Sequence, residues 1–141
     1  MDFDPEYTPI QMMEMGVFGG AYFAKAKPDD FKGMNDNIVK LAKTQIGPFS
    51  IDNNYFKVKA GQTHAEWVKQ KWIFDEDPLG WFQWYCRYHS GRRHERDDHQ
   101  IQRWINYNTR FGKRNLSRDK RRDALSLVVK QGLLQWSCKF S

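Results

Sequence analysis

The sequence predicts a mainly α-helical protein, a small irregular helical bundle around one aromatic core helix. Hydrophobic residues fill 40% of the 141 positions, which is enough for one core, and the length suits a single domain. Six Trp, six Tyr and ten Phe must supply much of the buried area. Apolar residues recur mostly at helical spacing, and strand-like alternation is confined to one short stretch. We expect residues 1–62 to be looser and residues 63–137 to form the helical core.

The first part of the chain predicts two short helices. Thr8 can cap a helix whose first position is Pro9, and Gly16 can end it. Residues 31–44 carry apolar side chains at helical spacing, which predicts a second amphipathic helix. Residues 51–59 alternate in part and are the one candidate for a short extended segment, although a lone strand would need a partner.

The middle of the chain predicts a short helix and then the aromatic one. Thr63 and Glu66 are spaced as a capping box for a helix over residues 64–72. Asp77 is suited to cap the next helix, over residues 78–91, which is apolar almost all round. We therefore expect that helix to be central and buried.

Two further helices complete the predicted bundle. Asp97 opens the first, which extends to Arg114, with Gln100 at the capping-box position. Ser117 caps the second, in which Gly132 permits a close helix crossing. The predicted buried faces are Ile101, Trp104, Ile105, Asn108 and Phe111 on the first and Leu125, Val128, Val129, Gly132, Leu133 and Trp136 on the second.

Positive charge is concentrated in the C-terminal half. Residues 87–122 hold twelve Lys and Arg against four Asp and Glu, a net charge of +8 within a chain of net charge +6. Such regional excess predicts a polyanion as partner, nucleic acid (DNA or RNA) first, and Arg predominates, which suits bidentate phosphate contacts. Tyr88 and Tyr107 are candidate stacking platforms. The predicted nucleic-acid contacts are Arg92, Arg93, Arg96, Arg103, Asn106, Arg110, Arg114, Arg118, Arg121 and Arg122.

Three other interpretations of the same residues stay open. A salt-bridged corner would pair Arg87, Arg92, Arg93 and Arg96 with Glu95, Asp97 and Asp98. The helix from Asp97 can instead be a duplex-reading helix that presents Gln102, Arg103, Asn106 and Arg110. An interaction module for an acidic protein partner would use the same charge.

A weaker hypothesis involves the thiol and the imidazoles of this region. Cys86, His89, His94 and His99 have ligand types that zinc accepts, although their spacing matches no familiar zinc motif, and we expect no metal and no cofactor. The three histidines are also candidate proton carriers in a small enzyme acting on a nucleotide or phosphorylated substrate. An enzyme is the less favoured alternative, because the chain carries no P-loop, dinucleotide fingerprint or serine nucleophile elbow.

Two cysteines and the absence of a long apolar stretch predict an intracellular protein, cytoplasmic or nuclear, without membrane association. The strings DPLGWFQWYCRYHSGRR, DDHQIQRW and ALSLVVKQGLLQW, with MGVFGGAYF and NNYFKV before them, resemble an uncharacterised family of small proteins of bacteria, fungi and plants. The resemblance implies a shared fold and a shared aromatic and arginine-rich corner, and it assigns no activity. The short link over residues 110–118 departs from the family, in which this insertion is longer.

Overall fold

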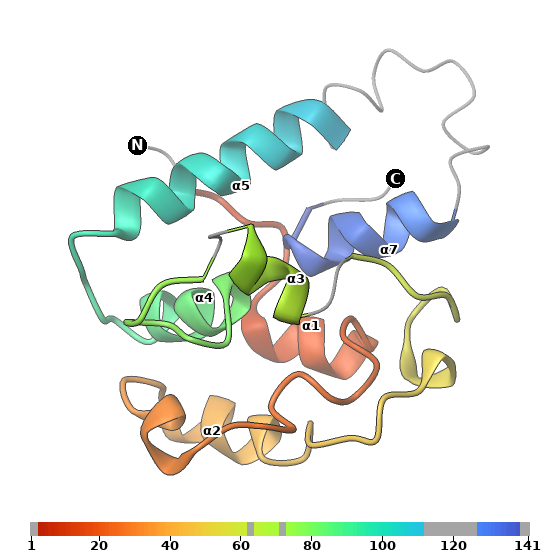
Figure 1. Cartoon of the computed structure of the whole chain (residues 1–141), viewed down its shortest axis with the longest axis horizontal. Helices are drawn as coiled ribbons and strands as arrows, with labels where there is room; N and C mark the ends of the chain where they lie inside the picture. Colours follow the sequence, from red (N-terminus) through yellow and green to blue (C-terminus); the bar gives the residue numbers. More distant parts are fainter. Residues whose placement is uncertain (1–2, 62–63, 71–72, 112–126, 139–141) are drawn as a thin grey trace.

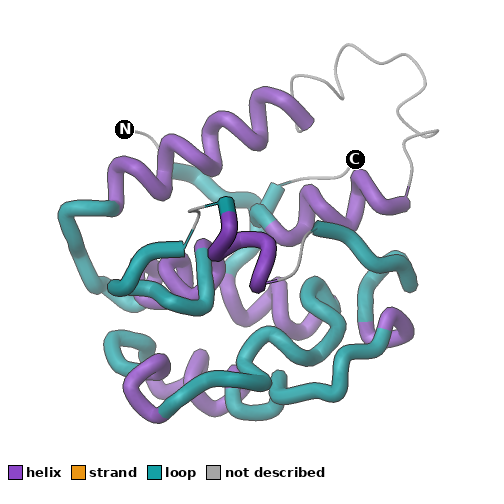
Figure 2. The backbone as a smooth tube through the Cα atoms, in the orientation of Figure 1, coloured by secondary structure: helices purple, strands orange, loops and turns teal. Residues whose placement is uncertain are grey.

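Short helices packed around one aromatic helix make up the structure, a computed structural model that describes residues 3–61, 64–70, 73–111 and 127–138 (Figure 1). Figure 2 shows helices and loops and no strand in these ranges, which confirms the predicted mainly helical class. None of the described helices is long and apolar enough to cross a bilayer. The helices are α1 (Pro9–Met15), η1 (Pro28–Phe31, 3₁₀), α2 (Asp36–Ala42), η2 (Ile51–Asn53, 3₁₀), α3 (His64–Lys69), α4 (Trp81–His89), α5 (Asp97–Phe111) and α7 (Leu127–Gln135).

Helix α4 is the centre of the core, as its sequence predicts. Every residue from Trp81 to Arg87 is buried, including the amide of Gln83. Gln83 satisfies its polar atoms with the backbone: its Nε2 donates to the carbonyl of Asp30 (3.0 Å) and its Oε1 accepts from the N–H of Leu79 (2.8 Å). This buried amide therefore holds η1 against α4.

The core cluster draws side chains from both halves of the chain. Met12 of α1, Ile38 of α2 and Leu133 of α7 have no exposed surface. Near the N-terminus, Phe3 inserts among rings of α4 and α5, and its ring centroid lies 5.1 Å from that of Trp104. Figure 1 places α5 and α7 on one side of α4 and α2 on the other.

Helix α4 begins later than predicted. Gly80, with φ of 111°, occupies the N-cap position, and Asp77 lies in the preceding turn, where its carbonyl accepts from the N–H of Gly80 (3.0 Å). The prediction of Asp77 as the cap was wrong, because its carboxylate binds the guanidinium groups of Arg87 and Arg92 instead.

The predicted start of α1 is confirmed. Thr8 Oγ1 accepts from the N–H of Gln11 (3.1 Å), Gln11 Oε1 accepts from the N–H of Thr8 (2.9 Å), and Pro9 follows. Gly16 ends the helix with φ of 83°, and a Cβ at this position would lie 1.9 Å from the carbonyl oxygen of Asn53. Glycine is therefore needed where the η2 turn approaches α1.

Two predictions for the first part were wrong in extent or type. Residues 51–59 form η2 and turns instead of a strand. Backbone groups that would pair within a sheet bond the buried side chain of Asn54 here: its Oδ1 accepts from the N–H of Gly19 (2.6 Å) and its Nδ2 donates to the carbonyl of Val58 (2.8 Å). The helix predicted over residues 31–44 shortens to α2, since Asn35 caps it by accepting from the N–H of Ile38 (2.9 Å).

Helix α5 begins at Asp97 and buries Ile101 and Trp104 as predicted. The predicted capping box is not formed. Asp97 accepts from the indole N–H of Trp84 and from the N–H of His94, each at 2.8 Å, and Gln100 Oε1 accepts from Arg103 at 3.0 Å. The carboxylate thus joins α4 to the start of α5.

Helix α7 buries Gly132 and Leu133 as predicted, but Val128 is 49% exposed. The buried face includes Gln131 instead, because its amide bonds the backbone of two other segments. Gly132 permits the close crossing: a Cβ there would lie 2.7 Å from the hydroxyl oxygen of Tyr107. The predicted caps Thr63 and Ser117, and Leu125, lie outside the described residues.

Replacing Gln131 by Leu tests this buried amide. Its Nε2 donates to the carbonyls of Val17 (2.9 Å) and Gly16 (3.2 Å), and its Oε1 accepts from the N–H of Phe56 (3.1 Å). Leucine has similar bulk and leaves these groups unsatisfied, so we expect the free energy of unfolding in urea to fall by about 2 to 3 kcal/mol. Gln102→Leu, on the exposed face of α5, should change it by less than about 0.5 kcal/mol. Equal losses would contradict the assignment.

Candidate functional site

The predicted arginine corner is built on one buried carboxylate. Asp77 is 3% exposed and binds two guanidinium groups. Arg87 Nη1 lies 2.9 Å from its Oδ1, and Arg92 contacts both carboxylate oxygens, at 2.9 Å and 2.8 Å. Arg87 is buried and Arg92 is partly buried, and the one carboxylate of Asp77 offsets half of their combined charge.

Arg87 also organises the loops around α4. Its Nε donates to the carbonyl of Lys32 (2.8 Å) and its Nη2 donates to the carbonyl of Asp29 (3.0 Å). A salt-bridged corner therefore exists, but its acids are Asp77 and Glu76 instead of the predicted Glu95, Asp97 and Asp98. The carboxylate of Asp97 is occupied by Trp84 and His94, and Glu95 and Asp98 are exposed.

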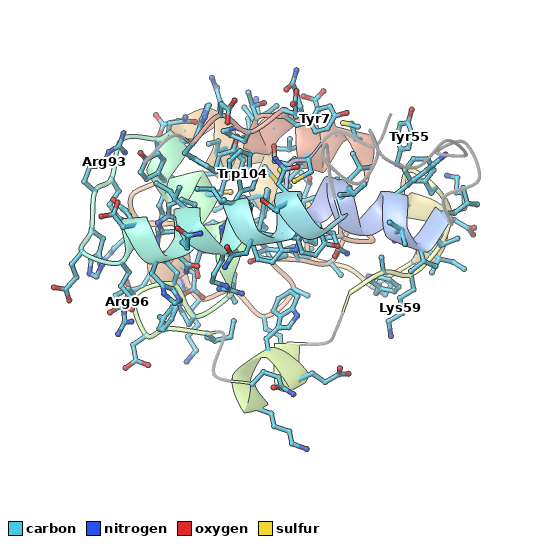
Figure 3. All side chains as sticks on the ribbon, turned by 90° about the horizontal axis from the view of Figure 1, so that it is seen from above. Tyr7, Tyr55, Lys59, Arg93, Arg96 and Trp104 are labelled. Carbon is cyan, nitrogen blue, oxygen red and sulfur yellow. The ribbon has the colours of Figure 1, made fainter. Side chains whose placement is uncertain are left out.

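Arg93 and Arg96 keep much of their guanidinium surface at the edge of the molecule (Figure 3). Arg93 is exposed and stacks over Tyr88, with its Cζ 3.9 Å from the ring centroid. Arg96 lies 4.1 Å over the ring of Phe74, and its side chain is 43% exposed at a longer contact of 3.4 Å with Glu76. A partly exposed pair of this kind contributes little to stability and leaves the cation accessible.

A polar row, which we call the α5 stripe, follows one side of α5. Its described members are Arg96, in the turn just before α5, and His99, Arg103 and Asn106 of α5, spaced three, four and three residues apart; such spacing keeps side chains on one side of a helix. His99 meets Phe74 edge-on, with ring centroids 5.1 Å apart. Partial burial and then the charges of Arg103 and Arg96 lower the pKa of His99, so the stripe carries a local positive field.

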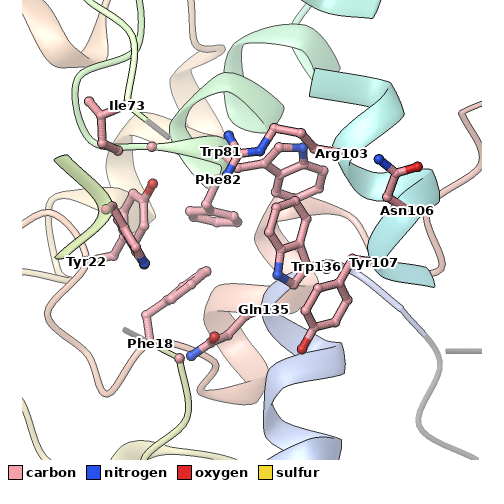
Figure 4. Close-up of a pocket in the computed structure, with 13 residues that line it drawn as sticks. Phe18, Tyr22, Ile73, Trp81, Phe82, Arg103, Asn106, Tyr107, Gln135 and Trp136 are labelled. Carbon is pink, nitrogen blue, oxygen red and sulfur yellow. The ribbon is translucent and has the colours of Figure 1, made fainter. Parts of the chain in front are cut away.

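A pocket of about 430 Å³ opens beside this stripe (Figure 4). Aromatic side chains form most of its wall, and polar groups come from α5 and α7. The lining residues are Phe18, Tyr22, Gly61, Trp67, Ile73, Gly80, Trp81, Phe82, Arg103, Asn106, Tyr107, Gln135 and Trp136.

Arg103 belongs to both the α5 stripe and the pocket. Its Nη1 donates to Gln100 Oε1 at 3.0 Å, and its Cζ lies 5.4 Å from the ring centroid of Trp136. Burial lowers the pKa of Arg103 to about 10, so the guanidinium stays protonated at neutral pH. The residues that line the pocket include this cation and no Asp or Glu, which favours an electron-rich or anionic ligand.

The pocket wall is held in place by packing. Tyr107 of α5 stacks on Trp136, just after α7, with ring centroids 5.1 Å apart and an interplanar angle of 18°. On the other side, the hydroxyl of Tyr22 donates to the carbonyl of Leu79 (2.7 Å) and accepts from the N–H of Gln83 (3.1 Å). The rings are therefore fixed in the absence of a ligand, as in most small-molecule sites.

The candidate thiol and imidazoles are not gathered into a site. Cys86 has no exposed surface, and burial raises the pKa of its thiol well above the ordinary value. His94 Nδ1 accepts from the N–H of Arg96 (3.2 Å), His89 is exposed on α4, and His99 lies on the α5 stripe. In the described part of the chain no three His, Cys, Asp or Glu side chains are grouped to hold a metal ion, and none of the histidines lines the pocket.

The remaining predicted contacts divide between α5 and the chain after it. Gln102 and Asn106 are exposed and bond each other through Nε2 and Oδ1 (2.8 Å), but Arg103 turns into the pocket wall, so the outward set predicted for a duplex-reading helix is incomplete. Arg110 lies in the last turn of α5, and its side chain is outside what the structure describes. Arg114, Arg118, Arg121 and Arg122 lie outside the described residues.

The sequence did not indicate the pocket. Its rings come from positions as far apart as Phe18, Trp67 and Trp136, and no local pattern connects them. The high content of aromatic residues was the one feature of the sequence that could have indicated an aromatic pocket, and it is equally typical of an aromatic core.

The variant Asp77→Asn tests the arginine corner. It keeps the shape of the side chain and removes the charge that Arg87 and Arg92 share, so we expect the free energy of unfolding to fall by about 3 to 5 kcal/mol. Asp75→Asn, two residues away and exposed, is the matched control and should cost less than about 0.5 kcal/mol. If urea titrations give the same midpoint for both variants, Asp77 does not hold the corner together.

In comparisons with known proteins, no family model, curated protein or solved structure matches this chain. The resemblance to an uncharacterised family stays a prediction, and the function must be argued from the site itself.

Proposed function

We propose that the protein binds nucleic acid, with phosphates held along the α5 stripe. The observation that carries the proposal is the placing of Arg96, in the turn before α5, beside His99 of α5, since both contact Phe74, with Arg103 one turn further along the helix. The two guanidinium-bearing positions are seven residues apart, or about 10 Å along the helix axis, so they can meet successive phosphates of one strand. Burial is the first cause of the lowered pKa of His99, and the charges of Arg103 and Arg96 lower it further.

The distribution of charge after folding supports the same partner. Asp77 and Glu76 offset two of the three charges of Arg87, Arg92 and Arg96, so these five side chains keep a net charge of +1. Residues 110–122 hold seven Lys and Arg against one Asp, a net charge of +6, and they begin in the last turn of α5. In the sequence, the α5 stripe is thus followed by the other predicted phosphate contacts, Arg110, Arg114, Arg118, Arg121 and Arg122.

A single strand fits these features better than a duplex. Reading a major groove requires a row of outward side chains, and Arg103 is turned towards Trp136. Single strands are held by cations together with rings on which bases stack, and this surface offers Arg93 over Tyr88 and the aromatic pocket beside Arg103. An acidic protein partner would use the cations without the rings.

Binding should weaken steeply as salt rises. We expect fluorescence anisotropy with a labelled oligo-dT of about 12 nucleotides to give a slope of log K against log salt near −2 to −4, from three to five phosphate contacts, between about 50 and 200 mM salt. Arg96→Gln should make that slope shallower by about 0.7, the value of one contact. Lys40→Gln removes an exposed charge from α2 and should leave the slope unchanged.

Two results would overturn the proposal. One is a slope near zero; the other is the absence of binding at about 50 mM salt, where electrostatic contacts are strongest. Binding of an acidic peptide with the same salt dependence, and no binding of oligo-dT, would favour the acidic protein partner.

Binding of single-stranded nucleic acid should also raise the pKa of His99. In the free protein, partial burial and the charges of Arg103 and Arg96 disfavour its protonated form, and a phosphate beside the ring would favour it. The affinity for the oligonucleotide should therefore rise as pH falls from about 8 to about 5.5. The gain is complete below the pKa that His99 has in the free protein. His99→Gln should flatten this dependence. An unchanged His99 titration in NMR spectra of the complex would place the strand elsewhere.

A further inference from the structure

The pocket and the α5 stripe share Arg103. A ligand of the pocket must therefore be one that also suits the phosphate-binding stripe beside it. Arg103 lies on the stripe with Arg96 and His99, and its side chain also lines the pocket (Figure 4). We infer that the pocket receives one unstacked base of a single strand whose phosphates lie on the stripe. This inference rests on the proposed function and adds a base site to it.

The form of the pocket suits a flat, neutral ring system. Its volume of about 430 Å³ lies within the range of small-molecule sites and gives room for a base. Faces and edges of Phe18, Tyr22, Phe82 and Trp136 surround the space in Figure 4. Every base has a π-face, so aromatic walls hold bases of any sequence.

The polar groups of the pocket suit the edge of a base. Base edges carry carbonyl and ring-nitrogen acceptors, and the guanidinium group of Arg103, which lines the pocket, is a planar group of N–H donors. Asn106, exposed on the next turn of the stripe, adds an amide N–H donor, while its Oδ1 already accepts from Gln102 (2.8 Å). The lining holds no Asp or Glu, so no carboxylate would offset the repulsion between Arg103 and a cationic ligand.

The geometry also explains why the base would come from a bound strand. Arg103 and Asn106 belong to the stripe and also line the pocket, so a base next to a phosphate bound on the stripe would lie near the pocket. The segment Ile73–Phe74 connects the two features, because Ile73 lines the pocket and Phe74 contacts Arg96 and His99.

The test compares two oligonucleotides with the same phosphates. One is oligo-dT of about 12 nucleotides, and the other is its abasic counterpart, in which every sugar lacks a base. We expect oligo-dT to bind about 10-fold tighter or more, because stacking of one base on aromatic side chains contributes on that order, with equal salt slopes for both. Equal affinities would overturn the base site and leave the proposed phosphate contacts standing. Failure of both oligonucleotides to bind would overturn the two proposals together.

Two matched tyrosine variants locate the base. Tyr107→Leu removes a ring of the pocket wall and should abolish most of the preference for oligo-dT over the abasic strand. Tyr88→Leu removes an equally half-buried ring beneath Arg93, outside the pocket, and should keep that preference. The opposite pattern would place the base on the Arg93–Tyr88 stack and overturn the pocket site. Asn106→Ala changes an exposed rim residue, which keeps the test open if Tyr107→Leu unfolds, and should reduce the preference a few-fold.

Discussion

The burial of α4 from Trp81 to Arg87 is the constraint on which the rest of the structure depends. A helical stretch with almost no exposed surface must satisfy the polar groups that it carries, and this one carries Gln83 and Arg87. Gln83 draws η1 onto the helix through the carbonyl of Asp30, and Arg87 draws in the carbonyls of Asp29 and Lys32 together with the carboxylate of Asp77. The irregular loops of the first half are therefore fixed by side chains of the second half.

This constraint separates two groups of arginines that look alike in the sequence. Arg87 and Arg92 belong to the packed interior, because the buried carboxylate of Asp77 forms ion pairs with both guanidinium groups. Arg93, Arg96 and Arg103 lie at its edge, where aromatic rings hold the guanidinium planes without neutralising them. The second group is therefore the one that we propose for ligand binding. One of its members, Arg103, also lines the pocket, whose walls are aromatic side chains packed on the same core.

Local chemistry predicted much of the fold. The cap at Thr8 and Pro9, the aromatic helix and the apolar face of α5 follow from patterns a few residues long, and the structure contains them. The side chains that each acid binds in the folded protein could not be predicted in the same way. Asp77 and Asp97 are both acids next to a helix, and their difference comes from the tertiary neighbours that reach them, guanidinium groups in one case and an indole in the other. The residues of the α5 stripe were named from sequence, but the pocket beside them depends on rings from distant segments.

Indole resonances give the most direct test, because the described tryptophans include both pocket and core residues. Trp67 and Trp136 line the pocket and are partly buried, Trp81 belongs to both the pocket wall and the core, and Trp84 and Trp104 are buried around Phe3. In ¹H–¹⁵N spectra recorded during a titration with oligo-dT, we expect large shifts of the Trp67 and Trp136 indoles and small shifts of the Trp84 and Trp104 indoles. Shifts confined to the core pair, or no indole shift at saturating strand, would contradict base binding in the pocket.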